Sequence, residues 1–269
     1  MLPAGDHDIV IGRVLDLDSA DEGLPLLFFQ GGYGSFTPRT MVASDERYTD
    51  QLSLIDRARH LLEGAARSVR GQVAVAHCDG HTFTVLAAAG QARIHGVDRA
   101  TIGERTSLIA PTGIWWISQA APDVVENWLR PVTASQRDRI CRVLSQVRED
   151  GGVTVGLASV HDQRRKFTVE RTNGIQRSPA EEAQLLCEAV SDPMDFVASR
   201  FGKTETSADH PEVRSIWSPV LDAQGRVVLG VMATGFPVDQ PLVEVVDAVR
   251  HLATSIGALT RESDHTEQG

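Results

Sequence analysis

The sequence predicts an α+β fold in which an antiparallel sheet is flanked by helices. Two hairpins and the order of the elements around them lead to this prediction. The first hairpin turns at Asp79-Gly80, and the second turns at 222–225, where Asp-Ala-Gln-Gly separates two apolar strands. Helical patterns precede, separate and follow the two hairpins. That order is typical of helices packed on an antiparallel sheet.

The composition is that of a packed globular protein. The chain has 269 residues, of which 42% are hydrophobic and 23% charged, close to globular averages. The formal net charge of −10 argues against a nucleic-acid-binding surface, which needs clustered Lys and Arg. No apolar run approaches the roughly 18 residues of a membrane span. Three widely spaced cysteines and the lack of a secretory signal predict a reduced, cytoplasmic protein.

The first element group consists of two expected strands, residues 7–15 and 24–29. Both carry the alternating or continuous apolar residues of a buried sheet. A glycine-rich turn over 31–34 ends the pattern. Residues 40–49 are expected to link this segment to the rest of the chain.

Residues 1–39 resemble the C-terminal end of the flavin reductase family, the split-barrel NAD(P)H:FMN oxidoreductases. The resemblance rests on Gly5-Asp6-His7 before a strand, on Leu24-Pro25-Leu26-Leu27-Phe28-Phe29, and on the turn Gly31-Gly32-Tyr33-Gly34. It implies a partial split β-barrel in which His7 and Asp6 are catalytic and His7 and Tyr33 contact the cofactor. It also implies FMN or FAD as the flavin, NAD(P)H as the substrate, and a partner monooxygenase that receives reduced flavin.

Most of such a barrel, including its phosphate-binding strands, would lie upstream of Met1. We therefore expect this polypeptide alone neither to bind FMN stoichiometrically nor to reduce flavin. A surface Asp-His pair at a strand entry is the structural alternative for Asp6 and His7. A tyrosine that packs inside a glycine turn is the alternative for Tyr33.

The elements after residue 44 follow from local patterns. Apolar residues at helical spacing predict a helix within 44–67, and Asp79-Gly80 supplies the positive φ angles that a two-residue hairpin turn requires. Thr133 to Gln136 matches a capping box, and Ser178-Pro179-Ala180-Glu181 predicts another helix start. The remaining expected elements are a partly helical segment over 104–130, a helix over 136–149, strands over 72–78, 81–88, 214–221 and 226–234, and a final helix over 242–260.

Residues 50–261 resemble the effector-binding domain of the IclR-type regulators, a GAF-like fold. The resemblance rests on 213–228, VRSIWSPVLDAQGRVV, and on Thr234-Gly235 at the end of the next strand. It implies a small organic-acid effector bound by Ser215 and Thr234, and a homodimer. Met232 stands where the family commonly has a small polar residue. Two alternatives therefore remain: the ligand class differs, or the pocket is closed.

Several features have structural alternatives. Ser215 and Thr234 could simply satisfy backbone groups in a half-buried sheet. Arg164-Arg165-Lys166 predicts a solvated loop or strand end, and Trp115-Trp116 predicts core or dimer contacts. Residues 262–269 are expected to be a disordered tail.

The run His77-Cys78-Asp79-Gly80-His81 contains metal-ligand residue types but predicts no metal site. Across the expected hairpin, Cys78 and His81 would face each other, while His77 would point to the opposite face. Two ligands on one face make a poor zinc site.

Two functions are compatible with these observations. The first is a flavin reductase whose C-terminal domain senses the substrate of a partner monooxygenase and gates reduction, which requires the effector to bind two conformations unequally. The alternative is a non-catalytic small-molecule sensor or interaction module. A DNA-binding regulator is not expected, because the winged helix of the IclR-type proteins is absent from this sequence and the net charge is negative.

Overall fold

A computed structural model describes the backbone of residues 2–4, 7–9, 26–29, 32–35, 40–42, 48–91 and 99–266, and the side chains of residues 48–91 and 99–260. The chain divides into two compact units, Met1–Pro38 and Arg39–Gly269.

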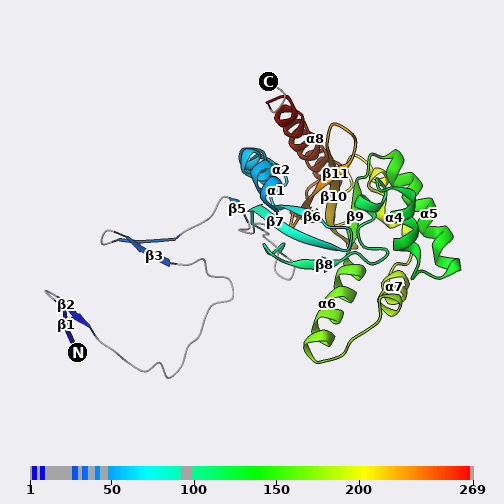
Figure 1. The fold of residues 1–269 in the computed structure, drawn as a ribbon, viewed down its shortest axis with the longest axis horizontal. Helices are drawn as coiled ribbons and strands as arrows, with labels where there is room; N and C mark the ends of the chain where they lie inside the picture. Colours follow the sequence, from blue (N-terminus) through cyan, green and yellow to red (C-terminus); the bar gives the residue numbers. More distant parts are fainter. Residues whose placement is uncertain are drawn as a thin grey trace. The chain divides into compact units, whose positions relative to one another are not determined.

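The described part of the first unit consists of two short antiparallel hairpins (Figure 1). Strand β1 (Leu2–Ala4) pairs with β2 (His7–Ile9), and β3 (Leu26–Phe29) pairs with β4 (Gly32–Ser35). The predicted strands over 7–15 and 24–29 are therefore present in part, and each pairs with a segment close to it in sequence. Residues 10–25 lie outside the described residues.

The second unit is built on one seven-stranded antiparallel sheet (Figure 1). The strand order is β5-β7-β6-β11-β10-β9, and β8 also pairs with β7. This sheet and its flanking helices confirm the predicted α+β fold class. The strands are β5 (Thr40–Val42), β6 (Gln72–Cys78), β7 (Thr82–Gly90), β8 (Arg105–Ser107), β9 (Thr154–Leu157), β10 (Val213–Leu221) and β11 (Val227–Thr234).

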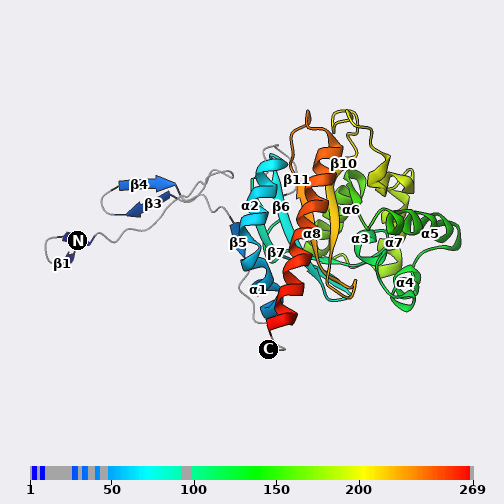
Figure 2. The same cartoon turned by 90° about the horizontal axis from the view of Figure 1, so that it is seen from above.

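Helices cover both faces of this sheet (Figure 2). One face packs against α1 (Thr49–Arg57), α2 (Arg59–Ser68) and α8 (Leu242–Thr266). The other side carries the middle of the chain, from α3 to η3. Those helices are α3 (Ile114–Ile117), α4 (Pro122–Leu129), α5 (Ala134–Glu149), α6 (Ala158–Thr172), α7 (Pro179–Glu188), η2 (Pro193–Phe196) and η3 (Ala198–Arg200).

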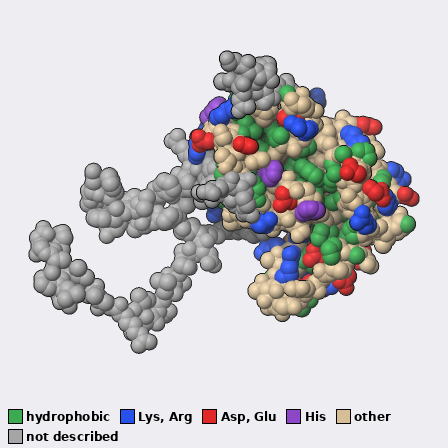
Figure 3. Space-filling model, viewed as in Figure 1, with side chains coloured by type: hydrophobic (Ala, Val, Ile, Leu, Met, Phe, Trp, Pro, Cys, Tyr) green, Lys and Arg blue, Asp and Glu red, His purple; other side chains and the backbone are tan. Residues whose placement is uncertain are grey.

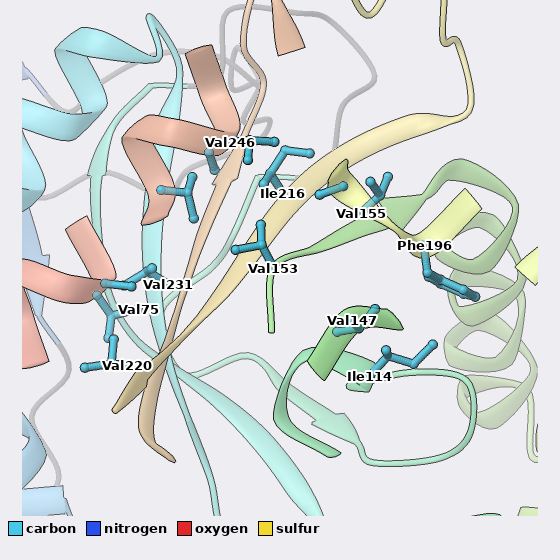
Figure 4. Packing of buried hydrophobic residues seen from close by; sticks show 14 of the residues in the cluster. Val75, Ile114, Val147, Val153, Val155, Phe196, Ile216, Val220, Val231 and Val246 are labelled. Atoms are coloured by element: carbon cyan, nitrogen blue, oxygen red, sulfur yellow. The ribbon is translucent and has the colours of Figure 1, made fainter. Parts of the chain in front are cut away.

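The face toward α8 carries completely buried aliphatic side chains. Val75 pairs with Val231 across β6 and β11, and Ile216 lies on the same face of β10. All three are completely buried, and Figure 4 shows Ile216 next to Val246 of α8 and Val75 next to Val231. At Gly257 the helix meets the sheet through main-chain atoms, because a Cβ there would lie 2.5 Å from the carbonyl oxygen of Leu221.

The first hairpin turns where the sequence predicts, but with a longer turn. Asp79 Oδ1 accepts hydrogen bonds from the backbone N–H groups of His81 at 2.9 Å and Thr82 at 2.7 Å, and Gly80 has a φ of +90°. Cys78 pairs with Phe83, so the expectation that Cys78 faces His81 is wrong. The backbone N–H of Asp79 donates to the carbonyl of Thr82, which makes residues 79–82 the turn.

The second hairpin is closed by a buried aspartate. Asp222 Oδ1 accepts from the backbone N–H groups of Gln224 at 2.9 Å and Arg226 at 2.8 Å, while Oδ2 accepts from Arg226 Nε at 2.8 Å. Burial opposes ionisation of this carboxyl, but its hydrogen bonds to Arg226 and Gln224 outweigh burial, and the pKa of Asp222 is lowered. The ionised side chain thus holds β10 and β11 at a fixed register.

Some elements differ from the sequence prediction. Residues 40–42 of the expected linker form β5, which pairs with β7. The expected helix over 44–67 is two helices that meet at Ala58. The segment 105–107 is a strand, and α8 continues into the expected tail.

The two predicted helix starts have different outcomes. Ser178 and Glu181 form the predicted capping box at the start of α7. The capping box predicted at Thr133 is wrong, because the Thr133 hydroxyl donates to the Gln136 side chain.

Candidate functional site

A cavity of about 530 Å³ lies on the face of the sheet opposite α8. Ala76, Trp217 and Thr234 contribute its sheet side, and α6 lies across from them. The segments 99–101 and 104–107 and the turn before α3 close its remaining sides. This volume lies within the range of small-molecule sites in proteins, roughly 300–1,000 Å³.

The sheet side of the cavity combines polar, small and large side chains. Thr234 pairs with Ser215, and Met232 pairs with Trp217, across β11 and β10. On the next strand, Met232 pairs with Ala74. Because paired residues point to the same side of a sheet, these residues lie on one face, and Thr234, Trp217 and Met232 line the cavity.

Three aromatic rings pack in a row at one side of the cavity. The Trp217 indole lies parallel to that of Trp115, with an interplanar angle of 6° and centroids 5.4 Å apart. Trp115 in turn packs against Phe83 with centroids 5.2 Å apart. Gly230 permits this arrangement, because a Cβ there would lie 2.2 Å from Trp115 Cη2.

Basic side chains dominate the charges at the cavity. Figure 3 shows Lys and Arg side chains over α6, and the Arg164 guanidinium donates to the Thr106 hydroxyl of β8. Glu104 and Glu182 are the acidic residues of the lining among the described residues. The local charge is therefore positive in a chain whose net charge is −10. The basic lining residues are Arg99, Arg105, His161, Arg164, Arg165 and Arg171.

The structure places the two predicted effector-binding residues side by side. Ser215 and Thr234 are paired across β10 and β11. Thr234 lines the cavity, and its hydroxyl donates to the carbonyl of Arg214 at 3.0 Å. Ser215 is completely buried, and its hydroxyl accepts a hydrogen bond from Trp217 Nε1 at 3.0 Å.

The three predicted flavin-site residues lie in the first unit. His7 pairs with Ala4 in the β1–β2 hairpin, and Tyr33 pairs with Phe28 in the β3–β4 hairpin. Asp6 lies outside the described residues.

Sequence reasoning missed the basic residues of α6. Arg164-Arg165-Lys166 was expected in a loop or strand end, but these residues lie within α6, and Arg164 and Arg165 line the cavity. The helix lacks a clear apolar stripe, because its buried apolar residues are only Val160 and Phe167. The clustering of three positive charges in an acidic chain was the available signal.

Neither a metal centre nor a membrane-spanning helix is found within the described ranges. Over residues 48–91 and 99–260, no group of three or more His, Cys, Asp or Glu side chains is arranged to hold a metal ion. Burial raises the pKa of the Cys78 thiol to about 12, so Cys78 is protonated at neutral pH. The described helices do not combine the length and the apolar composition that crossing a membrane needs.

No protein-family model and no curated protein matches the chain. Several solved structures are similar to the chain. A transcriptional regulator from Rhodococcus sp. RHA1 superposes with a TM-score of 0.50 at 19% identity, covering 80% of this chain and 71% of that one. An IclR regulator from Alicyclobacillus acidocaldarius gives a TM-score of 0.50 at 13% identity, covering 80% and 70%.

A third similar structure contains a ligand. It is an IclR homologue from Microbacterium hydrocarbonoxydans in complex with 4-hydroxybenzoate, with a TM-score of 0.50 at 15% identity, covering 78% of this chain and 69% of that one. At these identities the similarity shows a shared fold. The second unit thus has the fold of IclR-type effector-binding domains, as the resemblance over 50–261 predicts.

The interpretation of the chain as a flavin reductase, an oxidoreductase that binds FMN, is corrected by these matches. The similar structures are transcriptional regulators, and none of the three described here is a flavin reductase. The predicted FMN or FAD, NAD(P)H and partner monooxygenase depend on the same interpretation. The short motifs around His7 and Tyr33 are too local to specify a barrel.

Proposed function

We propose that the second unit is a ligand-sensing domain that binds a small organic acid in its cavity. The observation that carries this proposal is the cluster of basic side chains at a cavity that is otherwise largely apolar. A carboxylate is the group that such a cavity would accommodate, because guanidinium groups pair with carboxylates through strong charge-assisted hydrogen bonds. The 4-hydroxybenzoate bound by a protein of the same fold supports this ligand class.

The cavity provides separate environments for the two ends of an acid. Arg164 and Arg165 approach from α6, where they would face the carboxylate. Trp217 and Met232 offer apolar surface for the body of the ligand, and Thr234 adds a hydroxyl. Sensing further requires that the acid bind one conformation of the domain better than another. The predicted homodimer would be the natural unit in which such a difference is transmitted.

Thermal denaturation with a panel of aromatic and aliphatic acids, including 4-hydroxybenzoate, tests the proposal. A bound acid raises the midpoint of unfolding, because it binds the folded state alone. We expect at least one acid to raise the midpoint in a concentration-dependent way. If no acid in the panel changes the midpoint, the proposed function is wrong.

Two arginine variants locate the binding site. Arg164→Gln removes a charge that lines the cavity and should weaken acid binding about tenfold, the equivalent of one charge-assisted hydrogen bond. Arg142→Gln is the matched control, since Arg142 is exposed on α5 and does not line the cavity. Equal losses in the two variants would indicate a general charge effect and contradict the proposed site.

A further inference from the structure

Ser215 has no access to the cavity, although Thr234 beside it does. The Ser215 side chain is completely buried and does not belong to the cavity lining over the described residues. Its hydroxyl lies over Gly156 of β9, where a Cβ would lie 2.0 Å from Ser215 Oγ. The hydroxyl is covered by its neighbours, so it does not present a contact to a ligand in the cavity.

The Ser215 hydroxyl instead holds the indole of Trp217. The two residues lie two apart on β10 and so share one face of the sheet. Trp217 Nε1 donates to Ser215 Oγ at 3.0 Å, and Trp115 covers one face of the same indole. The hydrogen bond fixes one edge of the indole, and the stacking contact fixes the plane of the ring.

The fixed indole borders the cavity. Trp217 is half-buried and belongs to the lining, and its stacking partner Trp115, which is only 3% exposed, also borders the cavity. The stack rests on β11, because Trp115 packs closely over Gly230. A rigid aromatic plane favours a flat ring, since parallel aromatic pairs gain energy beyond their buried area.

We infer that Trp217 selects planar aromatic acids over non-planar acids of the same size, and that Ser215 is a positioning residue that sets the tilt of this indole. The inference rests on the proposed function, because it assumes that acids bind in this cavity. It changes the role of Ser215 from a ligand of the effector to a support for the residue that contacts it.

Isothermal titration calorimetry with benzoate and with cyclohexanecarboxylate tests the inference. The two acids carry the same charge and have similar size, but only benzoate is flat. We expect the wild type to bind benzoate about fivefold more tightly, the affinity equivalent of one aromatic pair. Trp217→Leu should reduce this ratio to about one, because a leucine offers no aromatic plane.

The ratio of the benzoate and cyclohexanecarboxylate affinities also distinguishes a positioning role of Ser215 from a purely structural one. Ser215→Ala should lower the preference for benzoate to about twofold, since the indole loses the acceptor that orients it. Ser218→Ala is the matched control, because Ser218 is a buried serine on the opposite face of the same strand. It should leave the ratio unchanged. Trp217→Phe keeps an aromatic ring and serves if the leucine variant does not fold; it should retain part of the preference.

The outcomes that overturn the inference differ from those that overturn the proposed function. Equal wild-type affinities for the two acids would overturn the inference alone. A loss of both affinities by the same factor in Ser215→Ala would do the same, because it would indicate a structural effect or direct contact. Failure of every acid to bind the wild type would overturn the proposed function and this inference with it.

Discussion

The two faces of the central sheet differ in how they are filled, although the same strands supply both. Toward α8, the strands present branched aliphatic residues such as Val75, Ile216 and Val231, all completely buried. Toward the cavity, Ala76 lies on the same lining as the large Trp217 and Met232. The comparison teaches that one set of strands can build a filled aliphatic core on one face and the mixed lining of a cavity on the other, because successive residues of a strand point to opposite faces.

The largest expected effect is on the face toward α8. Ile216→Ala removes a completely buried side chain from a region closed by α8, where the surroundings cannot collapse. The free energy of unfolding should fall by about 2–5 kcal/mol, measured by urea denaturation. A loss well below 1 kcal/mol would show that this face is as loosely packed as the cavity face.

A smaller effect is expected where the aromatic stack touches β11. Gly230→Ala places a Cβ 2.2 Å from Trp115 Cη2, so the ring must shift. We expect a loss of about 1–3 kcal/mol, typical of overpacking, together with a changed near-ultraviolet circular dichroism spectrum.

Gly64→Ala provides the contrast, since in α2 the nearest atom to an added Cβ is the end of the Arg67 side chain at 3.9 Å. That variant should gain about 0.5–1 kcal/mol through helix propensity. Equal changes in stability for the two substitutions would contradict a close contact at Gly230.

The cavity face itself should tolerate the loss of one hydroxyl. Thr234→Val keeps the shape of the side chain but removes its hydrogen bond to the carbonyl of Arg214. We expect a loss of about 0.5–1.5 kcal/mol, the usual net value of one hydrogen bond. Chemical denaturation measures the loss, and acid titration of the same variant shows whether the hydroxyl also contacts a ligand. A gain in stability would contradict the assigned bond.

The smallest effect concerns the turn that joins the two strands. The pKa of Asp222 is lowered in the folded state, so its stabilising contribution is present above the unfolded value of about 3.9 and is lost as the pH falls through the folded pKa. Asp222→Asn should therefore be less stable than the wild type at pH 7. Urea midpoints from pH 7 down to pH 2.5 should show this difference shrinking. A difference that stays constant with pH would exclude the charge as its cause.

Local signals predicted the elements that form within a few residues. Asp79-Gly80 and Asp222 to Gly225 predicted both hairpins, because their turns depend on side chains and φ angles of the turn itself. Ser178 predicted the start of α7 through its capping box. The strands predicted over 214–221 and 226–234 are present as β10 and β11, and they carry Ser215 and Thr234.

The tertiary features could not be predicted from the sequence. Arg164 faces the cavity only because α6 crosses the open side of the sheet, which no local pattern in 158–172 indicates. The sequence placed Ser215 on the correct strand, but its partner Trp217 depends on the stack with Trp115, about a hundred residues earlier in the chain. Motifs near His7 were similarly local and predicted a barrel that the solved structures do not support.

Gly257 has a geometric consequence for the last helix. Since α8 touches Leu221 through main-chain atoms at this position, no layer of side chains separates helix from strand there. A methyl group at residue 257 would act as a wedge, tilting the later turns outward while Val245 and Val246 hold the earlier turns in the core. The direction of α8 relative to the sheet thus depends on the lack of a Cβ at Gly257.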